Sequence, residues 1–177
     1  MKNAYSKKNI HIPEKEGREM KARYDSYCGL NCGACPIGLA NETNNTDAIE
    51  QMAKDWEAEI SDLKCSGCKT ELTAIFCTSC AMRICAREKQ LEFCYQCDEY
   101  PCEKITEFRN DKAPHHSAVF SNLENIKKKG LEPWLIAEKA RWSCPDCGNR
   151  FSWYTDTCSK CNKELYNAVE EEKNLKV

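Results

Sequence analysis

Long apolar runs are missing from this chain of 177 residues. A helix that crosses a membrane needs about 20 consecutive apolar residues, and no segment approaches that length. Residues 1–27 also lack the basic stretch followed by an apolar stretch that marks an export signal. We therefore expect a soluble, cytoplasmic protein without a membrane partner.

Apolar side chains for a core are also scarce. The hydrophobic fraction of 41% includes the 15 cysteines, and without them it falls to roughly a third of the chain. So thin a core stabilises a fold poorly, whereas one structural zinc ion contributes on the order of 10 kcal/mol to folding. We expect the metal-free chain to be largely unfolded.

Excess positive charge is absent as well, since the net charge is −2. Proteins that neutralise many phosphates of a nucleic acid usually carry a basic surface. The lysines at 127–129, with Arg141, Trp153 and Tyr154, suggest a local nucleic-acid surface, but lysines near a helix end also complement the helix dipole. We therefore expect a protein partner before a nucleic acid.

Cysteine, by contrast, is abundant. Fifteen cysteines are several-fold more than core packing requires, so their thiols must be disulfides or metal ligands. The cytosol keeps thiols reduced, and an odd total fits disulfides poorly. All 15 cysteines are therefore predicted to be metal ligands.

The C-terminal part of the chain has the most specific pattern. Two C-x2-C turns are formed there by Cys144, Cys147, Cys158 and Cys161. Each spacing lets a tight turn direct two sulfurs at one ion about 2.3 Å away, so two turns complete a tetrahedron. A glycine and an asparagine follow the turns, where a left-handed backbone is often needed. The pattern predicts a zinc ribbon over 143–166, with a β-hairpin strand over 150–154 and a closed, structural zinc site.

Eight further cysteines lie in the centre of the chain: Cys65, Cys68, Cys77, Cys80, Cys85, Cys94, Cys97 and Cys102. Six of them form two copies of the pattern C-x2-C-x4-C. Eight thiolates fill two more four-cysteine zinc sites, although the sequence does not show which cysteines share an ion. The third cysteine of each copy, Cys85 or Cys102, is expected near the start of a helix, where a thiolate is favoured.

Pro36 is expected at the first position of a short helix, so Cys35 should lie near the positive end of that helix. The remaining triplet, Cys28, Cys32 and Cys35, has three interpretations. Zinc is expected first, completed by His115, His116 or His11, or by a central cysteine. The second interpretation is a [4Fe–4S] cluster with a distant fourth ligand. The third is the C-x3-C-x2-C motif of radical S-adenosylmethionine enzymes, but the chain has no room for their long run of strand-helix units.

The expected fold is a small, metal-stabilised α+β structure with short helices around clustered zinc knuckles. Apolar spacing predicts an amphipathic helix from Thr46 to about residue 60, and a helical hairpin that turns at Gly130 with its second helix starting at Pro133. The expected divisions are a disordered tail (1–23), a cysteine-rich metal-binding domain (24–112), the helical hairpin (113–142), the ribbon (143–166) and a C-terminal tail (167–177).

Several of these motifs together resemble a known family. The stretches 28–36, 85–88 and 93–102, with the pair Cys65 and Cys68, follow the order and spacing of the cysteine-rich domain-of-unknown-function family numbered 3795. Extended members of that family are similar from Gly130 onward and end in a ribbon. The resemblance implies a prokaryotic, zinc-binding protein without an assigned activity.

No nucleophile with a base and no pair of acids stands out, so no catalytic residue is predicted. The expected function is a non-enzymatic protein that binds several zinc ions and acts as a scaffold or adaptor for a macromolecular partner. The alternative is an iron–sulfur redox protein or cluster-dependent enzyme that uses Cys28, Cys32 and Cys35.

Overall fold

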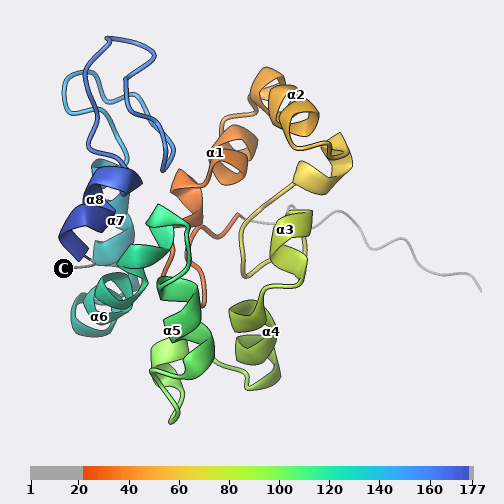
Figure 1. Cartoon of the computed structure of the whole chain (residues 1–177), viewed down its shortest axis with the longest axis vertical. Coiled ribbons are helices and arrows are strands. Elements are labelled where there is room, and N and C mark those ends of the chain that lie inside the picture. Colours follow the sequence, from red (N-terminus) through yellow and green to blue (C-terminus); the bar gives the residue numbers. More distant parts are fainter. Residues whose placement is uncertain (1–21, 176–177) are drawn as a thin grey trace, which may run out of the picture.

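Helices dominate the computed structural model, which describes residues 22–175. Of these residues 53% are helical and 4% are in bridges or strands. In chain order, with η for short 3-10 helices, the elements are η1 (Cys32–Ala34), α1 (Pro36–Glu42), α2 (Thr46–Asp55), η2 (Ile60–Leu63), α3 (Ile75–Thr78), α4 (Ala81–Glu88), η3 (Cys94–Gln96), α5 (Glu103–Arg109), η4 (Pro114–Ala118), α6 (Val119–Lys129), α7 (Leu131–Arg141) and α8 (Ala168–Leu175) (Figure 1). The expected tail over 1–23 lies almost wholly outside the described residues.

The predicted α+β class is wrong, because residues 22–175 contain no sheet. Three isolated bridges replace it: Asp25 with Asn31, Ser143 with Arg150, and Thr157 with Glu164. The predicted strand over 150–154 does not form, since its backbone groups pair outside a hairpin. The Trp153 amide donates to the Ala34 carbonyl, and the Trp153 carbonyl accepts from the Ala168 amide. The β-hairpin of the predicted ribbon is therefore absent.

The predicted amphipathic helix is present as α2, but it is shorter than expected. Asn45, and not Thr46, is the N-cap, and its side chain accepts a hydrogen bond from the Ala48 amide. The helix ends at Asp55, so Trp56 lies beyond it and is 44% exposed. Ile49, Met52 and Ala53 of the predicted stripe thus pack inward, whereas Trp56 and Ile60 are exposed.

Two consecutive helices, α6 and α7, form where the hairpin is predicted, and they contact each other. Gly130 ends α6 with a φ of 88°, a conformation that suits glycine. The second helix starts at Leu131 and not at Pro133, which occupies its first turn. None of the helices described in 22–175 has the length and apolar character to cross a membrane.

Two clusters of buried apolar side chains hold the helices together. The larger one contains residues from Cys28 to Ala168, among them Phe93, Leu123 and Trp142. The smaller one consists of Ile37, Ala53, Leu63 and Ala74. Figure 1 shows α1, α2 and α3 on one side, α6, α7 and α8 on the other, and α4 and α5 at the base. Seven of the 15 cysteines line the space between these sides.

Candidate metal centres

The four C-terminal cysteines converge on one point. Their sulfur atoms all lie within 4.8 Å of one another, with 3.5 Å between Cys144 and Cys161 and 3.6 Å between Cys147 and Cys158. All 15 cysteines lie in the described part of the chain and none forms a disulfide. Four sulfurs at these separations can surround one metal ion. We call this group the four-cysteine site.

The two turns of the four-cysteine site have the local geometry that their spacing predicts. The Gly148 amide donates to the Cys144 carbonyl over 2.8 Å, and the Asn162 amide donates to the Cys158 carbonyl over 2.9 Å. Gly148 and Asn162 have left-handed backbones, with φ of 71° and 60°. Local chemistry therefore shapes both turns although no hairpin joins them.

Amide hydrogen bonds influence the acidity of these thiols. The Lys160 amide is the largest influence on Cys158 and helps to lower its pKa to about 6. The Lys163 amide acts on Cys161 in the same direction, but the neighbouring thiols and burial outweigh it and raise that pKa to about 12. The site thus favours a first thiolate, and a bound cation would displace the remaining thiol protons.

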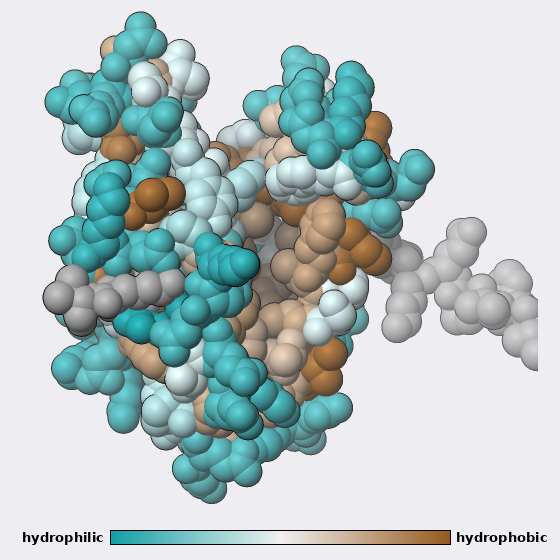
Figure 2. Space-filling model, in the orientation of Figure 1, coloured by the Kyte–Doolittle hydropathy of each residue, from teal (hydrophilic) through white to brown (hydrophobic). Residues whose placement is uncertain are grey.

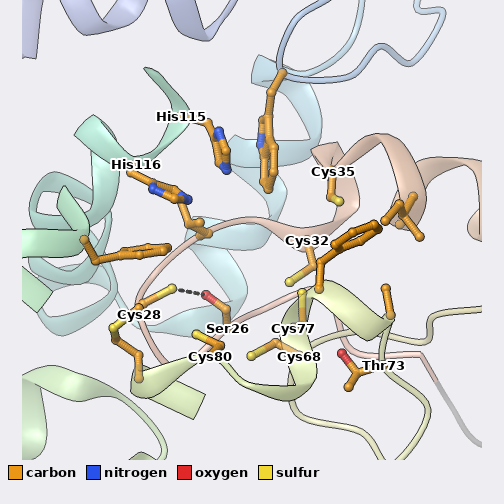
Figure 3. A pocket seen from close by; sticks show the side chains of 18 of the residues that line it. Ser26, Cys28, Cys32, Cys35, Cys68, Thr73, Cys77, Cys80, His115 and His116 are labelled. Carbon is orange, nitrogen blue, oxygen red and sulfur yellow. Dashed lines mark hydrogen bonds between the residues drawn. The ribbon is translucent and has the colours of Figure 1, made fainter. Parts of the chain in front are cut away.

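A cavity of about 860 Å³ lies between the two sides of the molecule, where Figure 2 shows a hollow with apolar residues at its edge. We call it the main cavity. Seven cysteines line it: Cys28, Cys32, Cys35, Cys65, Cys68, Cys77 and Cys80. Figure 3 shows the sulfurs of six of them around one space. The first triplet therefore shares its surroundings with four of the central cysteines.

The triplet enters the main cavity from the segment before α1. The Cys32 amide donates to the Tyr24 carbonyl over 2.7 Å, and Cys35 is the N-cap of α1, as predicted. Gly38 lets α1 lie against this segment, because a Cβ there would collide with the Cys32 carbonyl. The short helix thus fixes the positions of the triplet.

Two polar side chains hold the next ligands in place. Asn41 in α1 accepts a hydrogen bond from the Cys65 amide over 3.2 Å and donates to the Leu63 carbonyl over 2.8 Å. Arg83 in α4 donates to the Cys68 carbonyl over 3.0 Å. These bonds hold the loop over 65–68 between α1 and α4.

A buried cation braces the same segments. The Lys69 side chain is 1% exposed, and its Nζ lies 2.7 Å from a carboxylate oxygen of Asp25 and 3.7 Å from the centre of the Phe93 ring. Burial would raise the pKa of Asp25, but the hydrogen bond and charge of Lys69, with help from Arg23, lower it overall. This ion pair joins three segments that carry cysteines.

Burial raises the pKa of five thiols of the main cavity, those of Cys28, Cys32, Cys35, Cys68 and Cys77. It raises the pKa of Cys28 to about 11 and that of Cys35 to about 12, and nearby thiolates act in the same direction. Thiolates that repel one another in an apolar cavity are stable only beside a cation. Metal binding here would therefore release protons.

The opposite wall of the main cavity carries aromatic side chains (Figure 3). His115 stacks on Trp153 with ring centres 3.9 Å apart, and its Nδ1 shares a hydrogen bond with the Tyr154 hydroxyl. Burial lowers the pKa of His115 to about 3, so its ring is neutral near pH 7.

Two of the three histidines considered as fourth ligands of the triplet, His115 and His116, line the main cavity. Each already uses one ring nitrogen, His115 with Tyr154 and His116 with Asp111 at 2.8 Å. The third candidate, His11, lies outside the described residues. Cysteines are thus the more numerous donors around the triplet.

The C-terminal region closes the same wall. Arg150 donates to the Gly33 carbonyl over 2.7 Å, and the Trp153 amide donates to the Ala34 carbonyl over 3.0 Å. Trp153 is 8% exposed, so it packs into the cavity wall and does not form the open stacking surface considered from the sequence. The segment between the two turns of the four-cysteine site therefore covers the triplet.

A second cavity, of about 420 Å³, is lined by Cys85, Cys94, Cys97 and Cys102. Cys102 is the N-cap of α5, as predicted. The prediction for Cys85 is wrong, because it lies inside α4 and Cys80 is the N-cap of that helix. The cysteines outside the four-cysteine site thus divide seven to four between two cavities.

The spacing of the sulfurs distinguishes the cavities from the four-cysteine site. Within residues 22–175, only the four-cysteine site brings three or more Cys, His, Asp or Glu ligand atoms within 4.8 Å of one another. The cysteines of the two cavities face shared spaces without converging on a single point.

Comparison with known proteins identifies one family. Residues 24–107 match the family described as "Protein of unknown function (DUF3795)". The resemblance is confirmed for the motifs from Cys28 to Cys102, whereas the stretch from Gly130 onward lies outside the match. The matched segment contains every cysteine of the two cavities but none of the four-cysteine site. No curated protein and no solved structure matches the chain.

Proposed function

We propose that this chain is an iron–sulfur redox protein whose working centre is held in the main cavity, with a structural zinc ion at the four-cysteine site. One observation carries the proposal: seven thiols line a single cavity without converging as ligands of one ion. Zinc draws four sulfurs to about 2.3 Å from itself. A cluster places its own irons and sulfides between its ligands, so cysteines around it stand farther apart.

The surroundings of the triplet support a cluster over the zinc expected from the sequence. Cys28, Cys32 and Cys35 share the main cavity with four central cysteines, so a fourth thiolate is available without a histidine. The space of about 860 Å³ far exceeds what one ion requires and is within the size range of ligand pockets.

The number of thiols has a further consequence for the chemistry. A [4Fe–4S] cluster takes four cysteine ligands, so three of the seven remain. The aromatic wall around His115 borders the space that remains in the cavity beside such a cluster, and this space favours redox chemistry on a small bound molecule.

Metal analysis of anaerobically purified protein tests this proposal. Iron and sulfide in equal amounts, with one zinc ion per chain and visible absorption, are the expected result. Zinc at every site and a colourless protein would overturn it and favour the multi-zinc scaffold for a macromolecular partner.

Two matched variants assign the metals to their sites. Cys32→Ser, in the triplet of the main cavity, should lose the iron of that cavity and retain zinc. Cys161→Ser, in the four-cysteine site, should lose zinc and retain most of the iron. Iron loss in Cys161→Ser with zinc loss in the main-cavity variant would contradict this assignment of the metals.

A further inference from the structure

The second cavity forms a complete and separate set of ligands. Its cysteines come from α4, η3 and the start of α5, and none of them lines the main cavity. We propose that Cys85, Cys94, Cys97 and Cys102 hold a closed [4Fe–4S] cluster that delivers electrons to the centre in the main cavity. The first half of this proposal stands on its own, and the second half rests on the proposed function.

Hydrogen bonds build the second cavity around its cysteines. The Gln96 side-chain oxygen accepts from the amides of Glu92 and Phe93, both at 2.9 Å. The Cys97 amide donates to the Cys94 carbonyl over 3.2 Å. These bonds hold the loop that carries Cys94 and Cys97, and the four thiols of the cavity match the ligand number of a [4Fe–4S] cluster.

A cation directed at one of these sulfurs is a second mark of a metal centre. Lys89 Nζ lies 3.3 Å from the Cys97 sulfur and 2.9 Å from a Glu99 carboxylate oxygen. Polar groups that hydrogen-bond to ligand atoms orient a metal centre and adjust its potential. The Lys89 side chain is 40% exposed, so this side of the cavity is accessible to a donor.

The two cavities share a wall. Met82 and Lys104 line both of them. Cys80 and Cys85 belong to the same helix, with a rise of about 7.5 Å between them. The Cys94 amide also donates to the carbonyl of Tyr27, the residue before Cys28, over 2.8 Å. A cluster in the second cavity therefore lies next to the main centre.

The electron balance of this relay is simple. A reduced one-electron donor, such as dithionite in the test, loses one electron to the irons of the second-cavity cluster. That cluster passes the electron to the main centre and returns to its oxidised state. No covalent bond forms or breaks within the protein, and with four cysteine ligands the relay cluster has no position for substrate.

The first test compares single variants in the full chain, with iron and sulfide counted per chain. Cys97→Ala should lose about four irons and four sulfides and keep the main centre, whereas Cys32→Ala, in the triplet, should lose the main centre and keep the second-cavity cluster. Dithionite should reduce the main centre at least tenfold more slowly in Cys97→Ala than in the wild type. Unchanged iron content in Cys97→Ala would contradict the second cluster. An unchanged rate of reduction of the main centre would contradict the electron relay.

The same two variants separate this inference from the proposed function. If Cys97→Ala keeps all iron while Cys32→Ala loses it, the proposed function stands and the second cluster fails. If Cys97→Ala loses all iron while Cys32→Ala loses none, the triplet holds no cluster and the second site alone stands.

A variant that keeps every cysteine tests the second cluster without the risk that loss of a ligand unfolds the protein. Lys89→Met removes the hydrogen bond and positive charge at Cys97, so the reduction potential of the second cluster should fall while that of the main centre stays unchanged. Lys128→Met, in an exposed ion pair on α6, is the matched control and should change neither potential. Equal potentials in Lys89→Met and the wild type would contradict a cluster at Cys97.

Discussion

The four-cysteine site and the main cavity are both formed by cysteines, but the arrangement of the sulfur atoms differs. In the first, two turns of fixed spacing bring four sulfurs within 4.8 Å of one another. In the second, seven cysteines from three segments (28–35, 65–68 and 77–80) surround a space of about 860 Å³. Short-range spacing therefore brings the sulfurs of the first site together, whereas tertiary packing gathers the thiols around a space for which we propose a larger inorganic group. The following four predictions test this difference, from the largest expected effect to the smallest.

Complete metal removal should unfold the chain. The apolar core is thin and many of its members are cysteines, so metal binding supplies much of the folding free energy. The helical circular dichroism signal should collapse on demetallation. Zinc alone should refill the four-cysteine site without restoring the native spectrum, whereas a metal-free chain that still melts cooperatively would contradict the prediction.

Lys69→Met should destabilise the protein by about 3–5 kcal/mol, because it leaves the buried Asp25 carboxylate without its main partner. The loss should affect the main cavity more than the four-cysteine site, since the ion pair joins cysteine segments of the cavities. Denaturant unfolding of the metal-loaded protein measures the change. Lys128→Met is the exposed control, and equal stability of the two variants would show that Lys69 is not a brace.

Arg150→Met should loosen the cover of the main cavity at a cost of about 1–3 kcal/mol, because the Gly33 carbonyl loses its donor. Visible absorption should bleach faster in air than in the wild type, while zinc content stays the same. Lys163→Met, also near the four-cysteine site but exposed, should bleach at the wild-type rate. Zinc loss in Arg150→Met would show that this change also disturbs the four-cysteine site, and it would contradict the prediction.

His115 should make stability depend on pH in the acidic range. Burial lowers its pKa from 6.5 to about 3, so the folded state keeps the ring neutral while the unfolded state takes up a proton below pH 6.5. The stabilisation is complete above pH 6.5 and is lost as the pH falls toward 3, by at most about 1.4 kcal/mol per pH unit. His115→Phe should flatten the slope of unfolding free energy between pH 6.5 and 5, and an unchanged slope would contradict this assignment.

Sequence reasoning succeeded where spacing along the chain decides the structure. The two C-terminal turns, the helix start at Pro36 and the end of α6 at Gly130 depend on neighbouring residues, and all three are found. The predicted strand over 150–154 fails because its backbone bonds with Ala34 and Ala168, which are distant in sequence.

The grouping of the cysteines could not be predicted for the same reason. Counting ligands set the triplet apart from the eight central cysteines, whereas packing places seven around one cavity and four around another. The Lys69 and Asp25 ion pair also had no sequence signal, since a lysine beside a cysteine is usually exposed. Contacts between residues distant in sequence decide which thiols lie together, and local sequence patterns do not predict these contacts.

The wall formed by Trp153 has a consequence for the order of assembly. The cysteines of the main cavity lie in the stretch from Cys28 to Cys80, whereas Arg150 and Trp153 are synthesised later. The ligands are thus complete before their cover exists. Metal can be inserted while the cavity is still open, and docking of the C-terminal region then seals the loaded centre.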